Sequence, residues 1–221
     1  MSNNEARAMR KKNSSNKIML PTLRLPEFAH RNGWQPTEVG KLLREYVERA
    51  ASGTELPVYS STRSGLQPQK DYYDDRELAN EGEYGVVPDG YFVYRHMSDD
   101  DTFKFNINQL GKSIAVSKEY PVFSVEGMDP YFLQYLLNES SAFKRFAIAQ
   151  KKGGTRTRLY LSILRTFSAH MPEPDEQSSI ANCLRSLDDA ITAAADKLEA
   201  LKTHKKGLVQ RLFPTIEEGE A

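Results

Sequence analysis

The residues best suited to chemistry in this sequence are the cations between positions 140 and 170. This stretch contains no aspartate or glutamate, and it holds Lys144, Arg145, Lys151, Lys152, Arg156, Arg158 and Arg165. At its centre, residues 150–158 place a pair of glycines among cations and hydroxyl groups. A loop of this kind can lay backbone N–H groups and side chains along phosphates. We therefore predict nucleic-acid contacts at Lys151, Lys152, Thr155, Arg156 and Arg158, although composition alone equally allows a solvated basic loop.

A second candidate contact lies between Tyr59 and Lys70, where arginine, glutamine, serine and threonine are concentrated. Arginine pairs with guanine, and glutamine with adenine, through two hydrogen bonds at the base edge in the major groove. The side chains expected to contact DNA here are Thr62, Arg63, Gln67, Gln69 and Lys70. An ordinary surface turn has the same composition and is the alternative.

A third and weaker group consists of Arg95, Lys104, Asn106 and Asn108. It lies in or near a segment where Phe103, Phe105 and Ile107 alternate with polar residues, as expected of a half-buried strand. The acidic segments 71–83 and 99–101 are expected to face away from DNA, because phosphate repels carboxylate.

No combination of residues in the chain predicts catalysis or metal binding. No lysine has an acid two positions before it, as a PD-(D/E)xK nuclease requires, and neither a GxGxxG nor a GxxxxGK[ST] phosphate loop occurs. The four histidines are scattered without metal-ligand spacing. We predict no catalytic residue, no metal and no cofactor, and we expect any catalysis to belong to a partner.

A long amphipathic helix is expected from Ile180 to Leu212. Apolar residues recur there in alternating steps of four and three, which is a heptad repeat. At 1.5 Å per residue the helix spans roughly 50 Å. A seam this narrow suits one partner helix, and we expect that helix to come from another chain. The predicted dimerisation residues are Ile180, Leu184, Leu187, Ile191, Leu198, Leu201, Leu208 and Leu212.

The rest of the chain is predicted to be an α+β domain with a mostly antiparallel sheet and short helices. Strands are expected at 56–61, 84–87, 91–95, 102–108, 113–117 and 122–125, where the period is two. A short helical pattern covers Pro36 to Ala51, and a second helix is expected to begin at the cap Asp129 with Pro130 in its first position. Its apolar face is predicted to hold Tyr131, Phe132, Tyr135, Leu136, Phe143 and Phe146.

Two parts of the sequence resemble the specificity subunits of type I restriction-modification enzymes. Met171 to Gln177, Ile180-Ala181, Leu187-Asp188 and the run His204 to Phe213 resemble a family repeat. In that repeat a proline-rich stretch ending in Glu-Gln opens a long helix. Pro21 to Phe28, followed by Gly33-Trp34, resembles the segment with which the family's recognition units begin.

The resemblance implies a non-catalytic subunit that reads the sequence of double-stranded DNA. By the same resemblance, methyltransferase subunits would bind this chain and modify adenine, and a motor-nuclease subunit would cleave unmodified DNA. Family members normally carry two recognition domains and two such helices, whereas this chain carries one of each, so the resemblance implies a half-length form. The alternatives are a coiled-coil adaptor that binds protein instead of DNA, and a decayed fragment of a specificity subunit.

The two helices of a family member run antiparallel, which gives an expectation for the helix partner. An antiparallel homodimer would set the acidic helix start against the basic helix end, and its two-fold symmetry would make the target two inverted half-sites.

Composition and charge bound the remaining possibilities. The formal net charge is zero, the single cysteine Cys183 cannot form an internal disulfide, and no apolar run approaches the ~20 residues that cross a bilayer. We expect a cytoplasmic protein without a membrane segment. The predicted organisation is a disordered basic tail at 1–17, a target recognition domain at 18–172, a coiled-coil helix at 173–213 and an acidic tail at 214–221.

Overall fold

The computed structural model describes residues 18–72, 82–151 and 155–213. The chain divides into two compact units, Met1–Ser178 and Ser179–Ala221. The two predicted tails, Lys152 and most of the acidic segment 71–83 lie outside the described residues. Within the described ranges, no helix combines the length and the apolar character needed to span a membrane.

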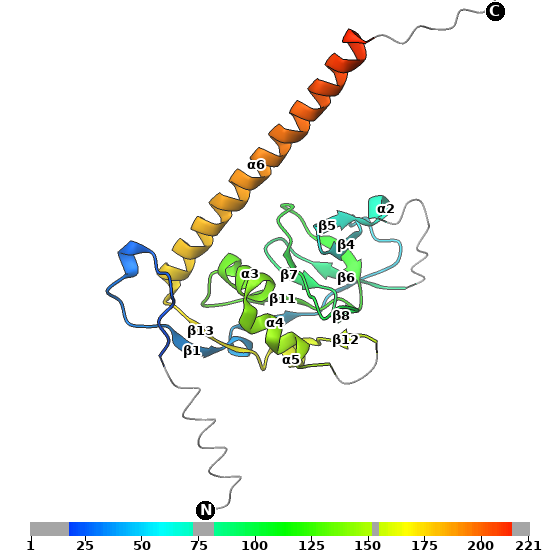
Figure 1. The fold of residues 1–221 in the computed structure, drawn as a ribbon. Coiled ribbons are helices and arrows are strands. Elements are labelled where there is room, and N and C mark those ends of the chain that lie inside the picture. The colour runs from blue at the N-terminus through cyan, green and yellow to red at the C-terminus, as the bar shows by residue number, and fades with distance from the viewer. Residues whose placement is uncertain (1–17, 73–81, 152–154, 214–221) are drawn as a thin grey trace, which may run out of the picture. The chain divides into compact units, whose positions relative to one another are not determined.

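The first unit is an α+β domain, as predicted (Figure 1). In chain order its first elements are η1 Pro26–Phe28, β1 Gln35–Glu38, η2 Val39–Lys41, β2 Leu43–Tyr46, β3 Arg49–Ala50, β4 Tyr59–Thr62, β5 Gly65–Pro68 and α2 Gln69–Tyr72. The strands β6 Tyr84–Val87, β7 Phe92–Tyr94, β8 Met97–Ser98, β9 Phe105–Ile107, β10 Ile114–Ser117 and β11 Val122–Val125 follow. The last elements are α3 Pro130–Glu139, α4 Ser141–Ile148, β12 Thr157–Arg158, α5 Leu161–Leu164 and β13 Ser168–Met171. The strands pair in the orders β2-β11-β7-β9, β10-β6-β3, β1-β13, β12-β8 and β4-β5, and every one of these pairs is antiparallel.

The core of this unit is aromatic. The rings of Phe92 and Phe123, on paired strands β7 and β11, stack with centroids 4.9 Å apart and planes 4° from parallel. Tyr94 is fully buried, and its hydroxyl donates to the Leu159 carbonyl at 2.8 Å, so the one polar atom of the ring is satisfied. We call residues 150–158 the basic loop. Strand β7 is thereby fixed against Leu159, which directly follows the basic loop.

The predicted cap at Asp129 is confirmed. Its side chain accepts from the Phe132 N–H at 2.9 Å, and Pro130 is the first residue of α3. The helix ends earlier than expected, because Ser140 leaves the helical conformation and caps α4 by accepting from the Phe143 N–H. The predicted apolar face is partly wrong: in α3 the buried residues are Phe132, Leu133 and Leu137.

The expected helix at Pro36 to Ala51 is wrong, and the segment forms β1, η2, β2 and β3 instead. Its backbone N–H and C=O groups are taken by three distant partners, β13, β11 and β6. Val39 and Leu43 are buried as the pattern suggested, whereas Val47 is exposed. Apolar spacing over so short a segment cannot separate a helix from strands, so long-range pairing decides the outcome.

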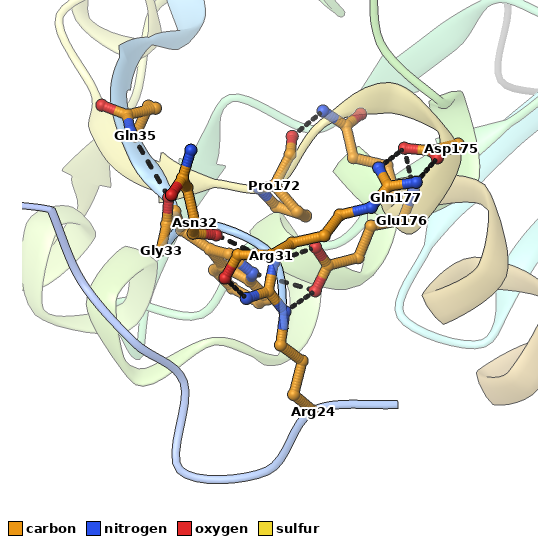
Figure 2. Close-up of polar contacts among 10 residues, drawn as sticks. Arg24, Arg31, Asn32, Gly33, Gln35, Pro172, Asp175, Glu176 and Gln177 are labelled. Atoms are coloured by element: carbon orange, nitrogen blue, oxygen red, sulfur yellow. Dashed lines mark hydrogen bonds and ion pairs between the residues drawn. The ribbon is translucent and has the colours of Figure 1, made fainter. Parts of the chain in front are cut away.

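A buried carboxylate joins the two ends of this unit (Figure 2). Glu176, with its side chain 1% exposed, accepts from Arg24 Nε at 2.8 Å, from Arg24 NH2 at 2.6 Å and from Trp34 Nε1 at 3.1 Å. Arg24 also donates to the backbone carbonyls of Arg31 and Asn32. We call Arg24, Trp34 and Glu176 the clasp. The hydrogen bonds from Arg24 and then Trp34 hold the pKa of Glu176 below its ordinary value.

The residue after the clasp carboxylate ties the same turn to α3. Gln177 accepts from the Asp129 N–H at 3.1 Å and donates to the Pro172 carbonyl at 2.9 Å. Ser178 donates to the second Asp129 oxygen at 2.9 Å. The first turn of the long helix α6, Pro174–Leu212, is therefore part of the first unit.

In the second unit α6 continues as one uninterrupted helix through Leu212, which confirms the long helix (Figure 1). Its predicted seam is apolar and largely in solvent. Ile180 and Leu184 are half-buried. The exposed seam residues are Leu187, Ile191, Leu198, Leu201, Leu208 and Leu212.

We expect Glu176→Gln to lower the free energy of unfolding by about 3 kcal/mol at neutral pH, because it leaves the Arg24 charge uncompensated in a buried site. Urea unfolding at one fixed protein concentration measures this. The matched control is Asp175→Asn, which affects an exposed ion pair with Arg31 on the same helical turn and should change stability little. Equal losses in the two variants would contradict a special role for the clasp.

The difference between wild type and Glu176→Gln should also depend on pH. Because the folded-state pKa of Glu176 is lowered, its carboxylate stabilises the fold at and above the ordinary glutamate pKa. That contribution is lost as the pH falls through the folded-state pKa, so the difference between the two unfolding curves should shrink as the pH falls below the ordinary glutamate pKa of about 4.3. A constant difference down to pH 2 would show that the carboxylate charge is not responsible.

Candidate nucleic-acid interface

The β4–β5 hairpin presents Arg63 at its tip. Thr62 and Gly65 face each other at the end of the ladder, the Thr62 hydroxyl donates to the Gly65 carbonyl at 2.8 Å, and the Ser64 N–H donates to that hydroxyl at 3.1 Å. Gly65 has a φ of 113°, which other residues rarely adopt, so the turn depends on this glycine. The result is a fixed tight turn with an exposed guanidinium.

Asn106 lies beneath this hairpin and is buried. From β9 its amide donates to the Ser61 hydroxyl at 2.9 Å and to the Thr62 carbonyl at 3.0 Å. Ser61 is itself buried and donates to the Val93 carbonyl. The sequence predicted a DNA contact at Asn106, and the structure places its side chain inside, where it supports the hairpin that carries Arg63.

A pocket of about 330 Å³ opens beside the hairpin tip. It brings together two of the three predicted groups, because its lining includes Thr62 and Arg63 from the hairpin together with Arg95 and Lys104. Arg95 is exposed, and Lys104 is half-buried with Glu139 at 3.6 Å. The remaining polar lining comes from hydroxyl groups of Ser61, Ser64, Ser98 and Thr102 and from Asp99.

The basic loop joins the same surface through β12. Thr157 and Arg158 pair with Ser98 and Met97 of β8, which leads directly into Asp99, Asp100 and Asp101. We call these three aspartates the acidic loop. Lys151, Thr155, Arg156 and Arg158 are exposed, as a contact with phosphate requires. All three predicted groups therefore lie around β8 and the acidic loop.

The acidic loop is ion-paired with the predicted DNA-contacting cations. Arg156 Nε donates to Asp99 at 2.8 Å, Arg63 NH2 to Asp100 at 2.6 Å, and Lys151 Nζ to Asp101 at 3.3 Å. Residues 99–101, which were expected to face away from DNA, thus lie against the cations that were predicted to contact it. Each cation is partly exposed, and a carboxylate is the nearest available counter-charge.

Local hydrogen bonds hold the acidic loop in place. Ser98 donates to Asp100 and lowers the pKa of that carboxyl most, followed by the Thr102 N–H and Arg63. Thr157 donates to Asp101, and this bond together with Lys151 lowers the pKa of Asp101. Asp101 also has a left-handed φ of 63°. Both carboxylates are therefore ionised at neutral pH, and their positions do not depend on the ion pairs alone.

Three of the predicted residues lie outside this arrangement. Gln67 faces Ser60 along the hairpin and is half-buried, and Gln69 and Lys70 belong to α2. None of them lines the pocket at the hairpin tip. Their predicted contacts stay predictions.

Sequence reasoning missed the residues that organise the surface, Ser98 and the acidic loop. The signal was present as three consecutive aspartates, but nothing in the sequence says which cations they meet 37 to 57 positions away. Among the described residues, no three His, Cys, Asp or Glu side chains gather in a group that could hold a metal ion.

Residues 72–203, more than half of the chain, match the family described as the type I restriction modification DNA specificity domain. A curated relative is the putative type I restriction enzyme MjaX specificity subunit of Methanocaldococcus jannaschii. It is 23% identical over 154 residues, which cover 64% of this chain and 34% of the relative.

Two solved structures show the same fold. The S subunit of the type I restriction-modification system of M. genitalium has a TM-score of 0.59 at 14% identity and covers 90% of this chain and 50% of its own. A structure reported for complex assembly and conformational transition of the type I R-M system has a TM-score of 0.51 at 12% identity, covering 95% of this chain and 50% of its own. The chain thus spans about half the length of these solved chains and a third of the curated relative.

Proposed function

The chain belongs to the type I restriction modification DNA specificity family, and from this premise we propose that it is the subunit that reads DNA sequence for partner enzymes. The partners are methyltransferase subunits that modify adenine and a motor-nuclease subunit that cleaves unmodified DNA. The chain itself supplies recognition and no catalytic group. The observation that carries the proposal is that cations from three separate segments lie around β8 and the acidic loop.

Phosphate contacts and base contacts make different demands on a cation, so we assign different cations to each. Phosphate contacts need exposed positive charge along a surface, and Lys151, Arg156 and Arg158 meet that requirement. Base contacts need a rigid donor that can enter a groove. Arg63 meets it, because the guanidinium stands on a tight turn that Asn106 braces from below.

Assembly is the second part of the proposal. Apolar side chains at heptad positions in solvent are unfavourable, at ~25 cal/mol per Å² of apolar surface, and pairing with a second helix removes that surface from water. We propose that the second helix comes from another copy of this chain and runs antiparallel. The two recognition domains would then read two inverted half-sites.

The charges on α6 support an antiparallel pair, although the two acidic residues of its first turn are not among the charges that do so. Asp175 and Glu176 already pair with Arg31 and Arg24 inside the first unit, so they contribute little to the helix pairing. Asp188 and Asp189 are the next acidic residues along the helix. In an antiparallel pair they approach the basic end, which holds Lys202, Lys205, Lys206 and Arg211.

For DNA binding, we expect Lys151→Ala, Arg156→Ala and Arg158→Ala together to weaken affinity for every sequence. The salt slope should flatten by about 0.9 for each phosphate contact that the substitutions remove. Fluorescence anisotropy of duplex DNA over a salt series measures both. The control removes three exposed lysines that neither line the pocket nor pair with the acidic loop, by Lys41→Ala, Lys112→Ala and Lys118→Ala. Unchanged affinity and slope in the first variant would overturn the proposed contact surface.

An adaptor that binds only protein predicts a different result. It should show no affinity for duplex DNA that falls with salt, and selection from a random DNA pool with the methyltransferase present should enrich no sequence.

Arg63→Ala tests the proposed reading of bases by Arg63. It should change which sequences are enriched more than it changes binding to random DNA, because a base contact carries roughly 1–3 kcal/mol of discrimination.

For assembly, we expect light scattering at tens of micromolar to give a dimer. Leu187→Asp with Leu201→Asp should give a monomer, since both place charge in the seam. The matched control adds the same charge on the opposite face of α6 with Ala193→Asp and Ala200→Asp, which cost the helix at least as much intrinsic propensity. A monomeric wild type, or cross-links that join Lys205 to Lys205, would overturn the antiparallel homodimer.

A further inference from the structure

One set of ion pairs has no part in the proposed function as stated, namely the one-to-one pairing of the acidic loop with the cations. Three consecutive aspartates hold three cations that come from two different segments, the hairpin and the basic loop. Packing does not require these pairs, because every member except Asp101 is more than a third exposed. Their common feature is that each cation is one for which DNA contact is proposed.

We propose that the acidic loop competes with DNA phosphate for Lys151 and Arg156, and so sets how strongly the protein discriminates its target from other DNA. This inference rests on the proposed DNA-reading function and deepens it. Asp99 and Asp101, which hold these two cations, are specificity-determining residues that act through them.

The strength of the pairs suits a competitor. Ion pairs between exposed side chains contribute little net free energy, because water screens them and long side chains lose rotamer freedom. A phosphate in a DNA duplex can therefore replace each carboxylate. Buried pairs of the kind found in the clasp would hold the cations too firmly for that exchange.

The acidic loop stays close to the cations after they are released. Ser98 pairs with Thr157 in the β8–β12 ladder, Ser98 and the Thr102 N–H hold Asp100, and Thr157 holds Asp101. None of these bonds involves Arg63, Lys151 or Arg156. Opening the ion pairs therefore leaves fixed negative charge beside the bound phosphates, and the repulsion persists in the complex.

The consequence differs between target and non-target DNA. Random sequence offers only phosphates, so its binding depends on the cations that the acidic loop occupies. The target adds base contacts, which carry sequence information and do not compete with the carboxylates to the same extent. A competitor for phosphate therefore weakens non-specific binding most and raises the ratio between the two affinities.

The test replaces Asp99 and Asp101 with asparagine in the full chain and leaves Asp100, the partner of the base-reading Arg63, in place. Asparagine keeps the size and the acceptor oxygen, and it tolerates the left-handed backbone at position 101. The probes are a random-sequence duplex and the duplex most enriched by selection. We expect affinity for the random duplex to rise at least about tenfold and its salt slope to steepen by up to about 0.9 for each freed cation. Affinity for the selected duplex should rise less.

A double-mutant cycle separates competition from a general change in charge or folding. If Asp99 acts through Arg156, Asp99→Asn should raise affinity for the random duplex in wild type and have little effect in Arg156→Ala. The matched charge control is Glu27→Gln and Glu55→Gln, two exposed acids that do not line the pocket. This control should leave the ratio of the two affinities unchanged.

The outcomes are distinguishable. If wild type binds DNA and the asparagine variant binds both duplexes with unchanged or weaker affinity, the competition is overturned and the proposed function stands. An equal gain in the glutamine control would also overturn it, because net charge alone would then explain the result. If no variant binds any duplex, the proposed function fails and this inference fails with it.

Discussion

The clasp is the interaction on which the rest of the domain depends. Arg24 and Glu176 lie 152 positions apart, so their ion pair closes a loop that contains all the strands β1 to β13. Strands β1 and β13 pair with Gln35 opposite Met171 and close the same loop a few residues inside the clasp. A charged pair buried to this degree stabilises a fold only when its donors and acceptors are satisfied. The indole of Trp34 and the carbonyls of Arg31 and Asn32 meet that condition.

The clasp and the acidic loop use the same chemistry with opposite consequences. In both, arginine donates to a carboxylate across a long separation in the sequence. The clasp carboxylate is buried and its arginine nearly so, and solvent screens neither charge well. The pairs of the acidic loop lie at the surface, where water and salt weaken them. Burial, and not the identity of the residues, distinguishes the clasp from the pairs of the acidic loop.

The sequence predicted some parts of this structure because their signals are local. The cap Asp129, the strands Tyr84–Val87 and Val122–Val125 and the long helix follow from side-chain periodicity and from capping chemistry within a few residues. The segment Pro36 to Ala51 was predicted wrongly, since its backbone is paired by strands far away in the chain. At the candidate interface, composition identified the cations of all three groups. It could not reveal that Asn106 is buried beneath the hairpin or that Asp99 to Asp101 lie among those cations.

The formal net charge of the chain is zero, and positive and negative side chains are also balanced locally at the candidate interface. A protein that holds DNA by charge alone benefits from unopposed cations, because each phosphate contact adds affinity for any sequence. A protein that must choose among sequences gains nothing from that affinity, since every competing site in a genome shares it. Carboxylates that pair with the cations lower the affinity that all sequences share, so that the base contacts determine which sequence is preferred. The neutral balance of this chain is therefore compatible with DNA recognition, and the pairing of Arg156 with Asp99 is one place where a cation meets a carboxylate at the candidate interface.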